Sequence, residues 1–420
     1  MVSKRSIIVS GQPLPEQTPE DLFGGADHKP LFDLPHDYDM KTALAPHIER
    51  ADGYVILPGS DPLLTTSLLI GYQFQNPEVF GKPMVIYSPD DKPSPYVELI
   101  QSLRERGFVH QPEEQFYKVA KTEAEIPEIL NSNFGTPSGP KVEGHEDDPV
   151  YQELVERINR EGAEKEKPQR SVAVFCSASN KDQHYLDLAR NTGRLLADNG
   201  YGMVFGGSNV SMMGEVAAGV HDRDGHVTGV TIPLFFGKEV QADQKKIDID
   251  NIRIVSDIYE RMHTMIDEAD ALVVLPGGIG TAQEMLAVMQ MRENEASLAA
   301  KPVILYNEDG FWDGLQKMME EYGYEEGVHF NVVDTQKDLE AVLNDGIPPA
   351  NTADPVPPVA KAANVSAWRG RTKPQTLPSG PEEATSRPED IKGPGHEAND
   401  PAPPVPQRAD DARAKRRRGL

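Results

Sequence analysis

The chain has 420 residues, and 42 Lys and Arg against 67 Asp and Glu give a formal net charge of -25. At about 100–200 residues per domain, this length predicts two or three domains. The charge argues against bulk nucleic acid or an anionic membrane as a partner, because phosphates would be repelled. The single Cys excludes a disulfide framework or a Cys-clustered metal site.

The apolar runs are strand-length and fall short of the roughly 18–20 residues that a membrane helix needs. Residues 1–10 carry only a short Ile7-Ile8-Val9 run, so we do not expect them to form a signal peptide. We therefore expect a cytoplasmic protein without a membrane partner. In chain order, residues 1–35 are expected to be irregular.

An internal repeat defines the next segment. Ala51–Gly59 (ADGYVILPG) matches Ala269–Gly277 (ADALVVLPG), and Lys82–Tyr87 (KPMVIY) matches Lys301–Tyr306 (KPVILY). The order and spacing agree, so we interpret residues 36–133 as a degenerate copy of the back half of a later α/β domain. The alternative is two ordinary βα units, since buried strands resemble one another.

Two segments have the composition of linkers or tails. Residues 134–170 begin with Gly, Pro and Ser turns and include a charged helix candidate at Tyr151–Arg160. Residues 347–420 are rich in Pro, Ala, Asp and Glu and poor in apolar residues, so we expect a disordered tail. Its basic end, Arg413–Arg418, is either a solvated cluster or a contact for an unknown partner.

Residues 171–346 alternate between apolar strands and helices. The strands have no polar alternation, which is typical of a parallel sheet buried on both faces. We therefore predict an α/β, Rossmann-like doubly wound parallel sheet. The predicted strands are Ser171–Phe175, Gly202–Phe205, Val227–Ile232, Ala271–Leu275 and Val303–Tyr306, and the predicted helices are Gln183–Asn199, Val210–Val220, Ile258–Glu268, Thr281–Met291, Phe311–Glu321 and Lys337–Leu343.

Three segments of this domain could carry chemistry. Pro276–Glu284 (PGGIGTAQE) follows a strand and opens a helix, and such a glycine turn with free N–H groups suits a phosphate. A second glycine turn, Gly206–Gly214 (GGSNVSMMG), has the same placement. Arg261 lies on the helix before the first turn and could clamp a phosphate, although an isolated arginine is more often a surface residue.

The sequence argues against several common types of nucleotide, nucleophile and metal site. The first strand runs into Cys176–Ser179 without the glycines of a dinucleotide fingerprint, and neither glycine turn has the Gly-Lys-Ser/Thr of a nucleotide triphosphatase. Cys176 has no suggestively placed His and is interpreted as a buried strand-end residue. His184, His221, His226 and His263 show no metal spacing, so we predict no metal site and no cofactor.

Together these segments resemble the Lonely Guy (LOG) family of cytokinin riboside 5′-monophosphate phosphoribohydrolases, many of which have been labelled lysine decarboxylases. The family motif PGGxGTxxE is complete from Pro276 to Glu284, and Arg261 matches the family's catalytic arginine. Ser208 and Ser211 replace two glycines of the other turn, and Met262 replaces a lysine. The resemblance covers residues 171–346.

The resemblance implies hydrolysis of the N-glycosidic bond of a nucleoside 5′-monophosphate to free base and ribose 5-phosphate. It makes Arg261 and Glu284 the catalytic candidates. The substrate is expected to be a cytokinin riboside monophosphate, as in cytokinin biosynthesis, or AMP, as in an AMP nucleosidase. The substrate-binding candidates are Gly206, Gly207, Gly214, Glu239, Met262, Gly277, Gly278, Ile279, Gly280 and Thr281. The family also implies a homo-oligomer, a dimer or larger.

The first copy lacks the residues that the resemblance makes catalytic. Thr66 stands at the position of Glu284 and Ala43 at that of Arg261, so this copy is predicted to be inactive. It would either imitate a partner subunit within the chain or cover the site as a lid. Two other functions remain open, a non-catalytic nucleotide sensor on the same fold and a scaffold acting through the tail.

Overall fold

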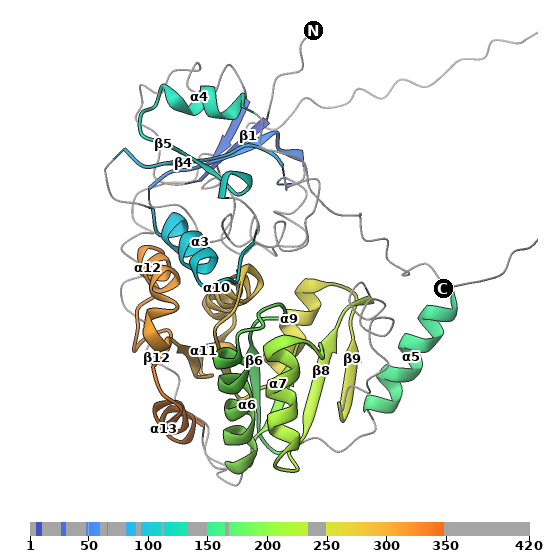
Figure 1. Ribbon diagram of the computed structural model, residues 1–420. Coiled ribbons are helices and arrows are strands. Elements are labelled where there is room, and N and C mark those ends of the chain that lie inside the picture. The colour runs from blue at the N-terminus through green and yellow to red at the C-terminus, as the bar shows by residue number, and fades with distance from the viewer. Residues whose placement is uncertain are drawn as a thin grey trace, which may run out of the picture. The chain divides into compact units, whose positions relative to one another are not determined.

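The computed structural model describes residues 6–10, 27–30, 48, 50–58, 65, 81–89, 94–110, 113–132, 149–163, 168–233 and 249–347. These residues form two parallel sheets with helices (Figure 1). The expected C-terminal tail, from residue 348 onward, lies outside the described residues. Within them, no helix has the length and apolar character that crossing a bilayer requires.

The larger sheet has seven strands, all parallel, in the order β12-β11-β10-β6-β7-β8-β9. The strand order reverses between β6 and β10, as in a doubly wound sheet, where ligands bind at the carboxyl edge beside this reversal. The predicted fold class is therefore confirmed. Its strands are β6 (Ser171–Phe175), β7 (Gly202–Phe205), β8 (Val227–Thr231), β9 (Asn251–Ile254), β10 (Ala271–Val274), β11 (Val303–Tyr306) and β12 (Asn331–Val333).

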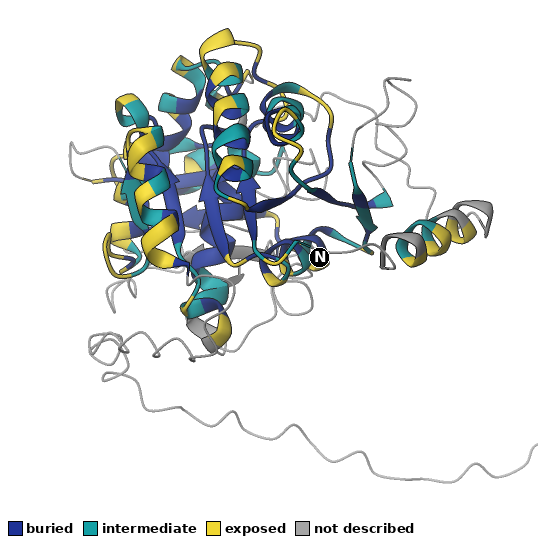
Figure 2. Cartoon of the chain, turned by 90° about the horizontal axis from the view of Figure 1, so that it is seen from below, coloured by how far each residue is buried: buried dark blue, intermediate teal, exposed yellow. Residues whose placement is uncertain are grey.

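Helices cover both faces of this sheet, and Figure 2 shows the central strands buried beneath helices with exposed outer faces. The six predicted helices begin and end within a few residues of their predicted bounds, whereas α11 and η5 were not predicted. The two strands missing from the prediction, β9 and β12, lie at the sheet's edges and are only partly buried, so they lack an apolar run. The helices are α6 (Gln183–Asp198), α7 (Ser211–His221), α9 (Ile258–Asp267), α10 (Ile279–Asn294), α11 (Ala296–Ala299), the 3-10 turn η5 (Glu308–Gly310), α12 (Asp313–Glu321) and α13 (Gln336–Gly346).

The linker helix is confirmed as α5 (Pro149–Ala163), which packs against the edge strand β9. The Asn159 amide donates to the Ile254 carbonyl at 2.7 Å, and the Asn159 carbonyl accepts the Ile254 N–H at 2.8 Å. An unpaired strand edge can template unwanted pairing. One side chain of the linker therefore satisfies part of the edge that β9 would otherwise expose.

The smaller sheet is also parallel, in the order β2-β1-β3-β4-β5. We expected residues 1–35 to be irregular, and this is wrong for β1 and β2. The short Ile7-Ile8-Val9 run is enough for a strand because β1 lies between β2 and β3, which satisfy its backbone on both sides. The elements are β1 (Ser6–Ser10), β2 (Asp27–Pro30), β3 (Gly53–Ile56), β4 (Met84–Tyr87), α3 (Pro95–Glu105), the 3-10 turn η4 (Glu113–Gln115), β5 (Lys118–Ala120) and α4 (Glu125–Leu130).

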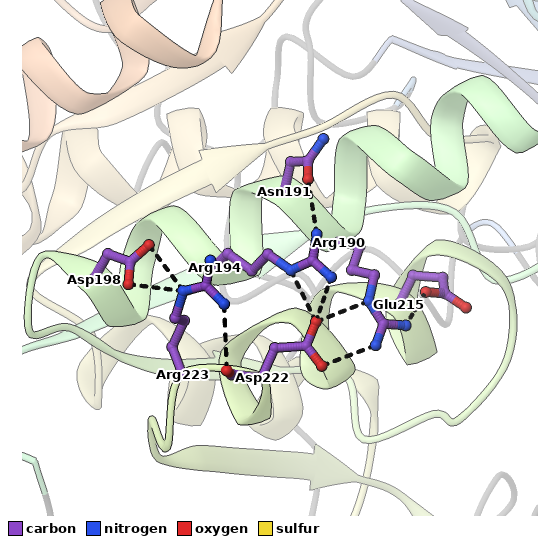
Figure 3. Close-up of polar contacts among 7 residues, drawn as sticks. All are labelled: Arg190, Asn191, Arg194, Asp198, Glu215, Asp222 and Arg223. Carbon is purple, nitrogen blue, oxygen red and sulfur yellow. Dashed lines mark hydrogen bonds and ion pairs between the residues drawn. The ribbon is translucent and has the colours of Figure 1, made fainter.

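Helices α6 and α7 approach each other closely because two glycines lie at their crossing. A Cβ on Gly193 would overlap the Val216 carbonyl, and a Cβ on Gly219 would overlap the Arg190 carbonyl. Around the same crossing Arg190 bonds Asp222 at 2.9 Å (Figure 3). The remaining members of this charged network are Asn191, Arg194, Asp198, Glu215 and Arg223. Because these groups are half-buried or exposed, the glycine contact contributes more to the packing than the ion pairs do.

This packing predicts opposite outcomes for two substitutions. Gly219→Ala should lower the free energy of unfolding by about 1–3 kcal/mol, because the added methyl group forces the helices apart. Asp222→Asn should cost no more than about 1 kcal/mol, as is usual for exposed pairs. Chemical denaturation checks both. An unhindered Gly→Ala change in a helix stabilises, so a more stable Gly219→Ala protein would contradict the close contact.

Candidate active site

The two predicted catalytic residues meet at the carboxyl edge of the seven-stranded sheet. Arg261, on α9, places its Nη1 3.4 Å from Oε1 of Glu284, on α10. Both are buried, with exposed fractions of 4% and 7%. Arg261 also donates from Nε to the carbonyl of Val230 on β8 at 2.9 Å, which orients the guanidinium. Three separate segments therefore have to be in place for this pair to form.

The protonation of Glu284 is set by its surroundings. Burial raises the pKa of its carboxyl group to about 7, and the neighbouring Arg261 opposes that rise. A carboxyl group that titrates near neutrality can exchange protons during a reaction, which an ordinary surface glutamate does less well. Perturbed carboxyl groups of this kind are typical of functional sites.

The neighbouring thiol is not suited to be a nucleophile. Cys176 is buried at the end of β6, and burial raises the pKa of its thiol, with a further contribution from the charge of Glu284. Because of this raised pKa, the thiol remains protonated at neutral pH. The thiolate, which is the reactive form, is therefore not available. The interpretation of Cys176 as a buried strand-end residue is confirmed.

The second glycine turn makes room for the guanidinium. A Cβ on Gly206 would overlap Nη2 of Arg261 and the methyl group of Met213, so only glycine fits beneath the arginine. The next residue, Gly207, has φ +79°, a conformation that side chains disfavour. Gly206, one of the predicted substrate-binding glycines, is therefore also required to seat Arg261.

The first glycine turn leads into the N-terminus of α10. The N-cap residue of α10 is Gly278, which has no side chain to cap the helix, whereas Asp257 caps α9 by accepting the N–H groups of Tyr259 and Glu260 at 3.0 and 3.1 Å. A helix N-terminus that lacks a side-chain cap attracts an anion. Gly277 fits tightly, because a Cβ there would overlap Thr281. The α10 end therefore offers the N–H donors that a phosphate needs.

The other predicted contacts fall into different environments. Ile279 and Gly280 lie half-buried in the first turn of α10, and Thr281 is buried beside them. Gly214 packs against the Asn209 carbonyl, 2.7 Å from where its Cβ would lie. Met262 is part of the hydrophobic core. Glu239 lies outside the described residues, and the substrate contacts of all these positions stay predictions.

Polar groups that the sequence did not single out also gather at this edge. Thr231, at the end of β8, is 2% exposed, and its hydroxyl has no hydrogen-bond partner among the described residues. Its Cβ lies 3.4 Å from where a Cβ on Gly207 would be. Gln283, beside Glu284, likewise has an unpartnered buried amide oxygen. No motif marked Thr231, and only its place at a strand's carboxyl end could have indicated it.

Metal ligands are not clustered in the part of the chain that the structure describes, where no group of three or more His, Cys, Asp or Glu could hold an ion. His184 pairs with Glu308, His221 with Asp250 and His263 with Glu295, each at a separate surface position. The arrangement favours chemistry by a carboxyl group, a guanidinium and backbone donors.

The sequence and fold can be compared with known proteins. Residues 213–343 match the family model described as "Possible lysine decarboxylase". A rice protein named "Probable cytokinin riboside 5′-monophosphate phosphoribohydrolase LOGL9" is 36% identical over 40% of this chain and 73% of its own length. Cytokinin riboside 5′-monophosphate phosphoribohydrolase LOG3 of Arabidopsis thaliana is 32% identical over 40% of this chain and 76% of its own.

A solved structure, the molybdenum cofactor binding protein of Rippkaea orientalis, is 18% identical, with a TM-score of 0.33, over 42% of this chain and 96% of its own. The relatives from rice and Arabidopsis are similar over most of their own length, and the PGGxGTxxE motif and Arg261 converge in the structure as the resemblance implied. The chain therefore belongs to the LOG family of cytokinin riboside 5′-monophosphate phosphoribohydrolases.

Proposed function

We propose that this chain hydrolyses the N-glycosidic bond of a nucleoside 5′-monophosphate, releasing a free base and ribose 5-phosphate. The observation that carries the proposal is the buried Arg261–Glu284 pair, which lies at the sheet's carboxyl edge between the Gly206 turn and α10. The named activity of the rice and Arabidopsis relatives supports it.

The chemistry follows from the charges. When the bond from C1′ to the base breaks, its electron pair leaves with the base and positive charge develops on the ribose, as in other glycoside hydrolyses. The Glu284 carboxylate stabilises that charge and accepts a proton from the attacking water. The water oxygen bonds to C1′, the departing base takes up a proton from solvent, and the proton accepted by Glu284 then returns to solvent. Arg261 holds Glu284 and assists departure of the base or binding of the phosphate.

The phosphate is assigned to the N-terminus of α10. The backbone N–H groups and the partial positive charge at this helix end suit a dianion. The net charge of -25 makes these local donors necessary, because the protein as a whole repels the substrate. The base is a cytokinin or adenine, and the replacements Ser208, Ser211 and Met262 make AMP as suitable a first test as a cytokinin nucleotide.

Removing the carboxylate should abolish turnover while leaving binding. In Glu284→Gln we expect kcat to fall at least about 100-fold, the usual effect of losing a proton-transfer group, with the dissociation constant for ribose 5-phosphate changed little. Chromatography of the released base from a panel of nucleoside monophosphates measures the first, and calorimetry the second.

The matched control is Glu295→Gln, at the far end of the same helix, where the carboxylate pairs only with His263 in the described structure. This variant should retain full activity. Unchanged base release in Glu284→Gln would refute the role of Glu284. Tight nucleotide binding without base release in the unaltered protein would instead indicate a nucleotide sensor.

The rate should depend on pH through Glu284. Since the carboxylate is the working form and its pKa is about 7, kcat/KM should rise as the pH increases through about 7 and fall about tenfold per unit below it. The substrate phosphate titrates near pH 6, so the pKa of Glu284 needs a separate measurement.

Protein stability supplies that measurement. The folded state binds the Glu284 proton more tightly than the unfolded chain does, so this residue's contribution to stability is present below pH 4.5 and is lost as the pH rises to about 7. The stability of the unaltered protein relative to Glu284→Gln should therefore decline across that window and level off above it. A constant difference would show that the pKa of Glu284 is unperturbed.

A further inference from the structure

Four strands of the smaller sheet correspond in register to four strands of the larger sheet, which extends the repeat beyond what the sequence indicated. The repeat aligns Tyr54 with Leu272 and Met84 with Val303, and β3 pairs Tyr54 with Met84 in the same register in which β10 pairs Leu272 with Val303. The register agrees at the next strands as well. Val85 pairs with Lys118 as Ile304 pairs with Asn331, and Ile8 pairs with Tyr54 as Ala173 pairs with Leu272. Strands β1, β3, β4 and β5 are therefore counterparts of β6, β10, β11 and β12.

The helices that follow correspond as well. Two residues after α3 ends at Glu105 comes Gly107, with φ +76°, and two residues after α12 ends at Glu321 comes Gly323, with φ +84°. After these glycines the Phe108 N–H bonds the Leu103 carbonyl at 2.8 Å, and the Tyr324 N–H bonds the Met319 carbonyl at 2.9 Å. The same helix and the same turn thus occur twice in the chain.

These counterpart helices pack against each other, as Figure 1 shows for α3 and α12. Gly314 of α12 fits against the α3 backbone, because a Cβ on it would lie 2.8 Å from the Leu99 nitrogen. Lys317 bonds Glu98 at 2.6 Å, and one hydrophobic core runs through both sheets. A contact of one element with its own counterpart is the arrangement found in a twofold dimer.

The turn after α3 also reaches the candidate active site. The Phe108 carbonyl oxygen lies 3.2 Å from where a Cβ on Gly278 would be. The Phe108 ring packs edge-on against Tyr185 and Phe311, with centroids 4.9 Å away in both cases. Arg106 secures the same turn by donating to the Asp309 carbonyl at 2.8 Å.

We infer that the N-terminal sheet is an internal partner subunit for the catalytic sheet, and that Phe108 is a positioning residue for the Gly277–Gly278 turn. This inference rests on the proposed function only in assigning phosphate binding to the Gly277–Gly278 turn. The Phe108 ring, packed against Tyr185 and Phe311, fixes the position of the Phe108 carbonyl against Gly278. The N–H groups at the start of α10 are thereby arranged for the phosphate before it binds. The counterpart residue, Tyr324, packs beside His329 instead.

The chain offers a matched pair of substitutions as the test. Gly107 and Gly323 both have positive φ, and neither has an atom within 4 Å of where a Cβ would lie. Gly107→Ala and Gly323→Ala should therefore cause similar backbone strain and similar losses of stability. Only Gly107→Ala should disturb the active-site turn at Gly277–Gly278, because Phe108 directly follows Gly107 and not Gly323.

Hydrogen exchange of the amides from 277 to 282 is the readout that does not depend on catalysis. Exchange should be several-fold faster in full-length Gly107→Ala than in Gly323→Ala, and Phe108→Ala should reproduce the effect. With substrate, KM should rise several-fold and kcat should change less, because the turn binds the phosphate in the ground state and the transition state alike.

Equal exchange rates in the two glycine variants would overturn the inference, whatever the activity. Failure of the unaltered protein to release any base would overturn the proposed function and leave the exchange result to decide the role of Phe108. If Phe108→Ala fails to fold, the two glycine variants decide the result alone.

Discussion

The structure of the site depends on burying an arginine and a glutamate together. Removing a charge from water costs several kcal/mol, and a buried pair is tolerated only when its remaining hydrogen-bonding groups are satisfied. Arg261 meets this condition through Glu284 and the Val230 carbonyl. The close fit of Gly206 under the guanidinium follows from the same requirement. One ion pair thus links α9, α10, β8 and the turn after β7.

The pair also explains how an acidic protein can act on an anionic substrate. Arg261 offsets only part of the desolvation of Glu284, so the carboxyl group keeps a pKa near 7. Under the proposed function, the phosphate is left to the backbone donors of α10, whose N-cap residue, Gly278, has no side chain. These donors act at short range, where the net charge of the whole chain matters least.

The sequence predicted the catalytic sheet well because its central strands are buried on both faces and flanked by glycine turns. It also predicted that Arg261 and Glu284 belong together, although only through the family motif. It missed β9 and β12, whose edge positions remove the need for an apolar run. It missed β1 because three apolar residues are too few to distinguish a strand. The contact of Phe108 with Gly278 joins distant parts of the chain and leaves no local pattern.

The central claim is that the glycosidic bond of a nucleoside monophosphate lies against the Arg261–Glu284 pair. A crystal structure of full-length Glu284→Gln with AMP tests this claim most directly. The account predicts that the phosphate lies at the N-terminus of α10 and that C1′ of the ribose faces the side chain at position 284. A nucleotide bound elsewhere, such as at the Arg190–Asp222 network, or a ribose turned away from Arg261, would contradict it.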